Sequence, residues 1–280
     1  LADGTIKGND YKMDIQADMR HVDLRALGLM ADTCNGSGHI NLCGTANPSA
    51  MLFDLAFGID DIDWVYGSEH IQLPHALDGT LLATSTDVAA ELNGDGLNAK
   101  FASDEPLKSV TANMDKLMAV VNRQLKDKAL DMEEIQALLP PFSISLDATE
   151  DGLMGDALGR MGYHCASLAV SVCNADSIVT GNARILSAGT TSISIDTALF
   201  DFTQRGKMID YGMHVGNRAG NMPEFASVDI NGYVGGNRGS VFLRQRNAKG
   251  KMGYRLGLTA ALMDSTVSVH LTPLAATIAY

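Results

Sequence analysis

Apolar side chains recur at every second position in several long segments of this chain. Between Tyr11 and Met19, apolar residues alternate with Lys12, Asp14, Gln16 and Asp18. The same alternation returns over residues 53–59, 142–148, 209–215, 252–258 and 267–271. A period of two is typical of β-strands that have one apolar face and one polar face. A long sheet of such strands must cover its apolar side with another sheet, a helix or a bound lipid, so the function depends on what covers that side.

Turn signals separate the alternating segments. Asn35-Gly36, Asp78-Gly79 and residues 93–96 have the composition of hairpin turns. Further turns are expected at residues 201–206, 216–220, 235–239 and 247–250. Because consecutive hairpins place sequence neighbours side by side, antiparallel pairing is the default. The sequence therefore predicts a mainly β fold, a long antiparallel meandering sheet curled into a trough or a sandwich.

A helical insert interrupts this pattern. Ser103-Asp104-Glu105-Pro106 is typical of a helix start, and apolar residues then follow at three- and four-residue spacing up to Leu125. A shorter helix is expected after Asp131, with Glu134 at the capping-box position and Pro140-Pro141 beyond its end. A third short helix is expected near residues 153–161. Two interpretations of the insert remain, packing against the sheet or plugging an apolar groove.

The predicted organisation has three segments, an N-terminal β-meander over 1–104, the helical insert over 105–141 and a C-terminal β-meander over 142–280. No apolar run reaches the roughly 18 residues that cross a bilayer. Because the chain has no basic leader and ends directly after a strand pattern, we expect it to be part of a longer protein whose signal or membrane anchor lies elsewhere.

The net charge of −12 conceals a gradient along the chain. Residues 1–104 hold 16 acidic and 5 basic side chains (net −11), whereas residues 205–280 hold 4 acidic and 9 basic side chains (net +5). The basic residues alternate with strand residues and lack the stacking aromatics of a nucleic-acid surface, so we expect no nucleic-acid partner. Contact of the basic end with anionic lipid headgroups is an alternative interpretation.

Catalytic and metal-binding patterns are weak. Asp60, Asp61 and Asp63 lack the ligand spacing of a calcium loop and indicate a solvated turn. Glu69, His70 and His75 lack the helical spacing of a zinc protease site and indicate a surface group. No nucleophile motif occurs. We expect a chain that is not an enzyme and that uses no cofactor or metal.

The four cysteines do not predict a disulfide framework. Cys165 and Cys173 lie on one side of the same predicted strand, roughly 26 Å apart, and cannot bridge each other if that strand is straight. Cys34 and Cys43 flank the turn expected at residues 35–38. Their disulfide state stays open, and no spacing of the zinc type appears.

Five segments carry a resemblance to a known family, and they are residues 21–29, 130–141, 146–148, 224–234 and 263–274. They resemble the AsmA-like / TamB family (translocation and assembly module subunit TamB) of Gram-negative bacteria, and the resemblance covers most of the chain. These motifs are structural, so no catalytic residues are transferred with them.

The resemblance implies a fold, a location and partners. Family members are very long β-sheets that span the periplasm, fold over into an open apolar trough and are anchored in the inner membrane. They work with an outer-membrane partner of the TamA/BAM type and move phospholipid, or assist outer-membrane protein assembly. Acyl chains suit such a trough because each buried methylene contributes about 0.8 kcal/mol.

The alternating segments and the resemblance together predict an apolar groove for phospholipid acyl chains. The residues expected to line it are Met13, Ile15, Phe53, Leu55, Phe57, Ile144, Leu146, Tyr211, Met213, Tyr254, Leu256, Val267 and Val269. The alternative is a self-packed β-sandwich or adhesin-like module that binds protein or glycan on its polar face. Interdigitated inner faces would favour the sandwich, and an open apolar cleft would favour the groove.

Overall fold

The computed structural model describes residues 2–7, 9–23, 25–26, 34–66, 69–73, 76–127, 131–217, 226–263, 266–272 and 277–278. Strands make up most of these residues. The strands are β1 (Ala2–Lys7), β2 (Asp10–Asp23), β3 (Cys34–Asn47), β4 (Leu52–Tyr66), β5 (Glu69–Leu73), β6 (Leu77–Ala83), β7 (Val88–Gly94), β8 (Leu97–Ser103), β9 (Phe142–Thr149), β10 (His164–Ala175), β11 (Ile178–Gly189), β12 (Ser194–Arg205), β13 (Met208–Gly216), β14 (Ser227–Gly235), β15 (Arg238–Arg246), β16 (Met252–Met263), β17 (Thr266–Leu271) and β18 (Thr277–Ile278). The helices are α1 (Leu107–Asp127), α2 (Met132–Gln136) and α3 (Leu153–Arg160).

The chain divides into two compact units. The N-terminal unit comprises Leu1–Thr111 and Asp151–Leu153, and the C-terminal unit comprises Ala112–Glu150 and Met154–Tyr280. Most of the helical insert expected over residues 105–141 thus belongs to the C-terminal unit, together with the strands that follow it.

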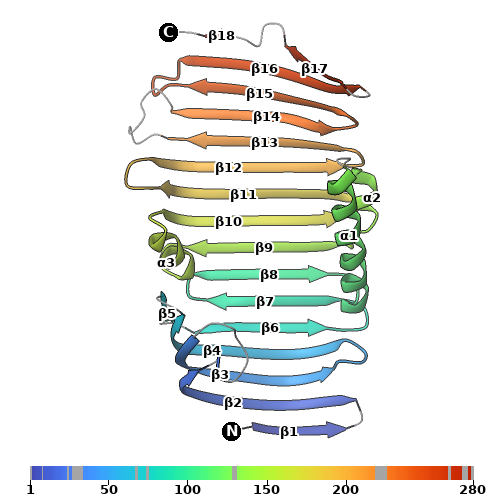
Figure 1. The fold of residues 1–280 in the computed structure, drawn as a ribbon, viewed down its shortest axis with the longest axis vertical. Helices are drawn as coiled ribbons and strands as arrows, with labels where there is room; N and C mark the ends of the chain where they lie inside the picture. Colours follow the sequence, from blue (N-terminus) through green and yellow to red (C-terminus); the bar gives the residue numbers. More distant parts are fainter. Residues whose placement is uncertain are drawn as a thin grey trace. The chain divides into compact units, whose positions relative to one another are not determined.

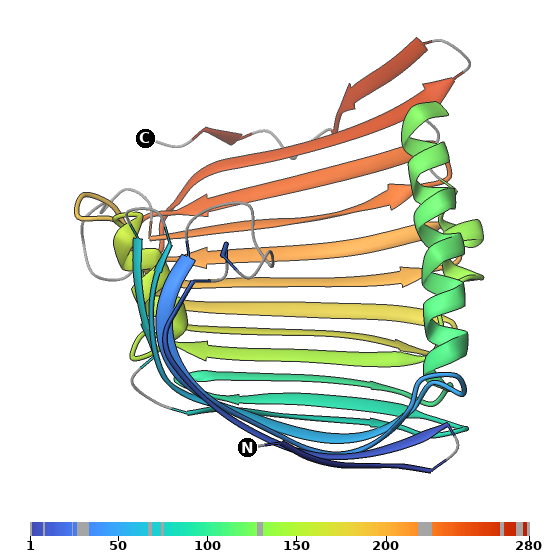
Figure 2. The same cartoon turned by 60° about the horizontal axis from the view of Figure 1, so that its bottom comes forward.

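The N-terminal unit is one antiparallel ladder. Strands β1, β2, β3 and β4 pair in sequence order, β4 then pairs with both β5 and β6, and β6, β7 and β8 continue the series. Figure 2 shows that the long strands β2, β3 and β4 bend along their length. The strand register shifts between Met19 and Val22 and again between Ser37 and His39, which indicates β-bulges in these bent strands.

The C-terminal unit is a second ladder of the same kind. Every strand from β9 to β16 pairs with the next one along the chain, always antiparallel, and β18 pairs with β16. Figure 1 shows β9 to β16 lying side by side in sequence order. The predicted mainly β, antiparallel meander is confirmed in both units.

The helices begin where the sequence predicts. Helix α1 follows the Ser103–Pro106 start, and Asp131 caps α2 by accepting hydrogen bonds from the backbone N–H groups of Glu133 and Glu134. The third expected helix is α3. The capping box at Glu134 does not form, because its carboxylate instead accepts hydrogen bonds from Arg123 and Gln124 of α1.

Three of the expected turns are wrong. Asn35-Gly36 lies within β3, Asp78-Gly79 lies within β6, and the Asp60–Asp63 segment lies within β4. Asp61 has a φ of 51° and is the site of a bulge, so the acidic triplet marks an irregular strand position. The turns at 93–96, 235–239 and 247–250 are confirmed, and the turn near 201–206 falls slightly later, at Gly206 and Lys207. The expected turn at 216–220 lies mostly outside the described residues.

The N-terminal unit contains a small cluster of buried apolar residues. Ala83, Val88 and Val110 are buried together, and Phe53, Leu81, Phe101 and Leu107 pack against them. This cluster lies where the start of α1 meets the ends of β6, β7 and β8. Within the described residues of each unit, no second sheet packs on the ladder.

Candidate functional site

The register of the N-terminal unit brings its apolar side chains onto one face. Cross-strand partners share a face in an antiparallel sheet, so each row of partners can be followed across β2, β3, β4, β6, β7 and β8. Two central rows are Met13, Gly44, Leu55, Leu81, Ala90, Phe101 and Ile15, Leu42, Phe57, Gly79, Leu92, Ala99. These two rows, with the flanking rows that begin at Tyr11 and Ala17, form the N-terminal apolar face. Five of the predicted lining residues, Met13, Ile15, Phe53, Leu55 and Phe57, lie on it.

The C-terminal unit carries a longer face of the same kind. One central row crosses nine strands and consists of Ile144, Val172, Gly181, Phe202, Tyr211, Gly232, Val241, Leu258 and Leu271. A second central row consists of Leu146, Val170, Ala183, Phe200, Met213, Ile230, Leu243 and Leu256. These two rows and their flanking rows form the C-terminal apolar face. The other eight predicted lining residues, Ile144, Leu146, Tyr211, Met213, Tyr254, Leu256, Val267 and Val269, lie on it.

The C-terminal apolar face is only partly covered by protein. Exposed fractions are 42% for Ile144, 42% for Phe200 and 39% for Met213, and they rise to 65% for Val267 and 60% for Val269 on β17. In the part of the chain that the structure describes, each unit contains one sheet, and no second sheet packs on the apolar face within either unit. Interdigitated sheet faces, as in a sandwich, are therefore absent inside each unit.

The accessible area of the whole chain agrees with single-layer packing. The chain exposes 17532 Å². A compact protein of 29.7 kDa exposes about 11,600 Å², and two separate globules of half that mass expose about 14,000 Å². The excess over both values shows that the thinness of the layers accounts for much of the exposed surface.

Glycines lie opposite aromatic residues at three places on the apolar faces. Phe57 pairs with Gly79, Phe202 with Gly181, and Tyr211 with Gly232. A Cβ atom at any of these three glycines would collide with the partner's side chain or a neighbouring backbone oxygen. The rings therefore lie across the neighbouring strand, and the Tyr211 hydroxyl donates a hydrogen bond of 3.0 Å to the Ser240 carbonyl oxygen.

Helix α2 and the segment after it cover one end of the C-terminal apolar face. Gln204 and Asn174 belong to the end row of that face and are 2% and 6% exposed. The Gln204 side-chain nitrogen donates a hydrogen bond of 2.8 Å to the Gln136 side-chain oxygen. The Asn174 side-chain nitrogen donates a hydrogen bond of 2.7 Å to the Pro140 carbonyl oxygen. The insert thus meets the face through polar contacts, while the central rows stay open.

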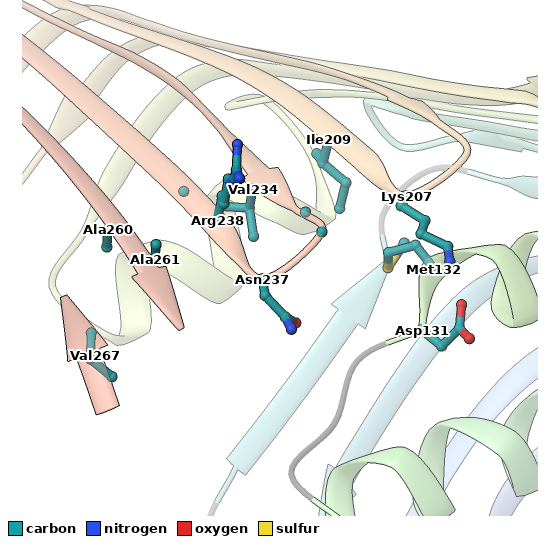
Figure 3. Close-up of a pocket in the computed structure, with 13 residues that line it drawn as sticks. Asp131, Met132, Lys207, Ile209, Val234, Asn237, Arg238, Ala260, Ala261 and Val267 are labelled. Carbon is teal, nitrogen blue, oxygen red and sulfur yellow. The ribbon is translucent and has the colours of Figure 1, made fainter. Parts of the chain in front are cut away.

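A hollow of about 840 Å³ lies beside α2, where this cover ends. Its floor continues the end row of the apolar face through Ile209, Val234, Gly239 and Ala260, with Val267 beyond. In Figure 3, Met132, Asp131 and Lys207 approach it from the α2 side, across from Asn237 and Val267. Lys207 also forms an ion pair of 3.2 Å with Glu133.

Among the residues that line this hollow, only Val267 was predicted from the sequence as a groove-lining residue. Ile209 stands in an alternating segment, which is a usable signal, but Val234 and Ala260 lie next to glycines and alanines that weaken the pattern. Met132 was expected only as an apolar helix residue. Its place at the hollow depends on where α2 docks, and nothing in the local sequence specifies that.

The opposite face of each ladder is polar and contains histidine–aspartate pairs. His39 pairs with Asp18 at 2.7 Å and His214 pairs with Asp229 at 2.7 Å, each across two neighbouring strands. The hydrogen bond between His39 and Asp18 raises the pKa of His39 and lowers the pKa of Asp18. A hydrogen bond from His70 likewise lowers the pKa of Asp63. These pairs lie on exposed strand surfaces and not in a cleft.

No metal-binding cluster of three or more His, Cys, Asp or Glu side chains occurs among the described residues. Cys43, Cys165 and Cys173 are free thiols. Burial raises the pKa of Cys165, which disfavours its reactive thiolate form. Glu69, His70 and His75 were predicted to form a surface group. His75 lies outside the described residues, and His70 contacts Asp63.

The geometry thus defines a mainly β protein with single-layer ladders and extended apolar faces. No protein-family model matches the chain, no curated protein matches it, and no solved structure matches it. The resemblance to the AsmA-like / TamB family stays a prediction. Among the described helices, none is both long and apolar enough to span a membrane.

Proposed function

We propose that this chain is a non-enzymatic segment that holds phospholipid acyl chains on its apolar faces. The observation that supports the proposal is the row of apolar side chains and glycines across nine consecutive strands, which a single-layer sheet leaves partly exposed. Contiguous exposed apolar surface is typical of sites that bind a partner, a ligand or a membrane, and this supports the proposal.

The dimensions of the C-terminal face suit acyl chains. Nine strands at about 4.8 Å spacing give a row about 38 Å long. One leaflet of a bilayer is about 15 Å of hydrocarbon, so one row accommodates about two acyl chains end to end. Each methylene that leaves water on such a surface contributes about 0.8 kcal/mol.

The cellular setting rests on the resemblance to the AsmA-like / TamB family. In that setting the chain is periplasmic, anchored in the inner membrane through another part of its protein, and it works with an outer-membrane TamA/BAM-type assembly protein. It would transfer phospholipid between the two membranes or assist outer-membrane assembly. The alternative function, an adhesin-like module that binds protein or glycan, would use the polar faces and leave the apolar faces without ligand.

Native mass spectrometry with lipid extraction tests the proposal. The chain purified from a Gram-negative host should carry phospholipid. Leu55→Asp, Phe57→Asp and Leu256→Asp should each reduce lipid occupancy, because a carboxylate on the apolar face must be desolvated by the bound chain. Circular dichroism would establish that each variant still folds.

Strand β12 offers a matched control. Phe200 on the apolar face is 42% exposed and its neighbour Leu199 on the polar face is 40% exposed. Phe200→Asp should lower phospholipid occupancy severalfold, whereas Leu199→Asp should leave it unchanged. Equal occupancy in the two variants, or a lipid-free wild-type chain, would reject lipid binding by the apolar face.

A further inference from the structure

Basic residues concentrate on one pair of strands. Residues 230–263 contain six Lys or Arg and no Asp or Glu, in a chain of net charge −12. Five of these six lie toward one end of β15 and β16 and in the turn between them, and all five are exposed. They form the basic patch, which consists of Arg244, Arg246, Lys249, Lys251 and Arg255.

The register makes this patch electrostatically unfavourable by itself. Arg244 lies directly opposite Arg255 across the β15–β16 ladder, and like charges in that position repel each other. Asp229 lies opposite Arg244 on β14, but its carboxylate is hydrogen-bonded to His214 at 2.7 Å. Within the described ranges, no ion pair joins Arg244, Arg246 or Arg255 to an acidic side chain. These three arginines therefore have positive charge available for an external anion.

The other face of the same strand ends is apolar. Tyr254 is 46% exposed and Leu256 is 38% exposed, and both belong to the C-terminal apolar face. Basic side chains beside an exposed tyrosine and aliphatic surface are typical of segments that contact the headgroup region of a bilayer. An acidic protein partner would account for the arginines alone and would leave Tyr254 and Leu256 unexplained.

We propose that the basic patch docks the C-terminal unit onto a bilayer surface that contains anionic phospholipid. The unit meets the bilayer with the ends of β15 and β16 and the turn between them, so that Arg244, Arg246 and Arg255 on the polar face bind headgroup phosphates and Tyr254 and Leu256 on the apolar face lie at the hydrocarbon boundary. Docking in this way places one end of the C-terminal apolar face against the lipid that it would receive or deliver. This last step rests on the proposed function, whereas the docking itself does not.

Vesicle co-sedimentation tests the docking. The chain should bind vesicles of phosphatidylcholine and phosphatidylglycerol, bind pure phosphatidylcholine vesicles much more weakly, and dissociate at high salt because the contacts are screened. The triple variant Arg244→Gln, Arg246→Gln, Arg255→Gln should bind the anionic vesicles about tenfold to a hundredfold more weakly, as expected for three juxtamembrane cations.

A control triple variant separates local from overall charge. Lys12→Gln, Arg20→Gln and Arg184→Gln remove three exposed cations elsewhere and should leave vesicle binding near the wild-type value. Equal losses in the two triple variants, equal binding to neutral vesicles, or no vesicle binding at all would overturn the proposal.

Lipid occupancy measured on the same proteins distinguishes this proposal from the proposed function. The Arg244, Arg246 and Arg255 variant should still take up phospholipid from detergent micelles, because its apolar face is intact. A wild-type chain that docks on anionic vesicles but carries no lipid would reject the acyl-chain function and keep the docking surface. A chain that carries lipid but does not bind the vesicles would reject the docking surface and keep the acyl-chain function.

Discussion

At the residue scale, glycine has two different roles in these ladders. Gly236 and Gly250 have positive φ angles in tight turns, where glycine avoids the steric cost of a Cβ atom. Gly79, Gly181 and Gly232 lie inside strands beneath aromatic rings of neighbouring strands. In the second role, the absence of a glycine side chain lets the aromatic ring of the neighbouring strand occupy that space on the apolar face.

Gly232→Ala tests the second role. The added Cβ would collide with the Ser240 carbonyl oxygen, a backbone atom, and would displace the Tyr211 hydroxyl. We expect a loss of about 1–3 kcal/mol in the free energy of unfolding, as for other overpacked sites. Urea denaturation followed by circular dichroism measures it.

Gly159→Ala is the control for this substitution. Gly159 lies in helix α3 with no atom within 4 Å of the added Cβ, so alanine should be neutral or stabilising by up to about 1 kcal/mol. A Gly232→Ala variant as stable as wild type would show that the ring and backbone can move aside at little cost.

These two roles explain where sequence reasoning succeeded and failed. Alternation predicted that Leu55, Phe57 and Leu256 lie on the apolar side of their strands, and the strand register places them there. The turns expected at Asn35-Gly36 and Asp78-Gly79 were wrong because a glycine beneath Trp64 or Phe57 has the same sequence signal as a turn glycine. The difference depends on a partner strand that is distant in the sequence.

At the scale of elements, helix α2 is held by polar interactions. It contains five residues and no buried side chain. Its attachments include the Asp131 cap, the ion pairs Lys207–Glu133 and Arg123–Glu134, and the contacts of Gln136 with Gln204 and the Ser177 carbonyl oxygen. The Gln124 side chain, 5% exposed, joins α1 to Asp131 through hydrogen bonds of 2.8 and 3.1 Å.

Asp131→Ala should loosen this element without unfolding the ladders. Removing an N-cap side chain costs about 1 kcal/mol, and α2 has little packing energy to offset the loss. Hydrogen exchange should therefore accelerate about fivefold at the amides of Glu133 and Glu134. Amides in the centres of β11 and β12 should keep their wild-type rates.

An exposed aspartate in the middle of α1 supplies the comparison. Asp115→Ala removes the same carboxylate from a helix interior, where alanine is the better helix former, so exchange in α2 should not change. If the Asp131→Ala variant also left α2 exchange at the wild-type rate, the cap would be dispensable. The start of this helix was predictable from Asp131, but its docking was not, because the contacts come from Gln124 and Gln204 on other elements.

At the scale of the whole molecule, the large exposed area has a thermodynamic consequence. The dependence of unfolding free energy on urea concentration, the m-value, scales with the surface that unfolding exposes. A fully unfolded chain of this mass exposes about 43,000 Å². Because the native chain already exposes 17532 Å², its m-value should be about one-fifth lower than that of a compact protein of equal length.

Urea titrations followed by circular dichroism and by the fluorescence of Trp64 measure this value. Trp64 is the single tryptophan and lies in the N-terminal unit. Coincident fluorescence and circular dichroism curves would indicate one unfolding transition. Separate curves would indicate two transitions, whose m-values must then be summed. A value typical of a compact protein of this length would mean that the apolar faces are covered in solution. The division into units at Thr111 is a whole-molecule property that alternation and turn signals do not encode.

Because each strand bonds mainly to its neighbours along the chain, evolution can lengthen or shorten such a ladder one hairpin at a time. Duplicating a hairpin would add about 10 Å of width without redesigning any existing contact, as in solenoid proteins. A gene that must match the gap between two distant compartments would then need only the right number of repeats.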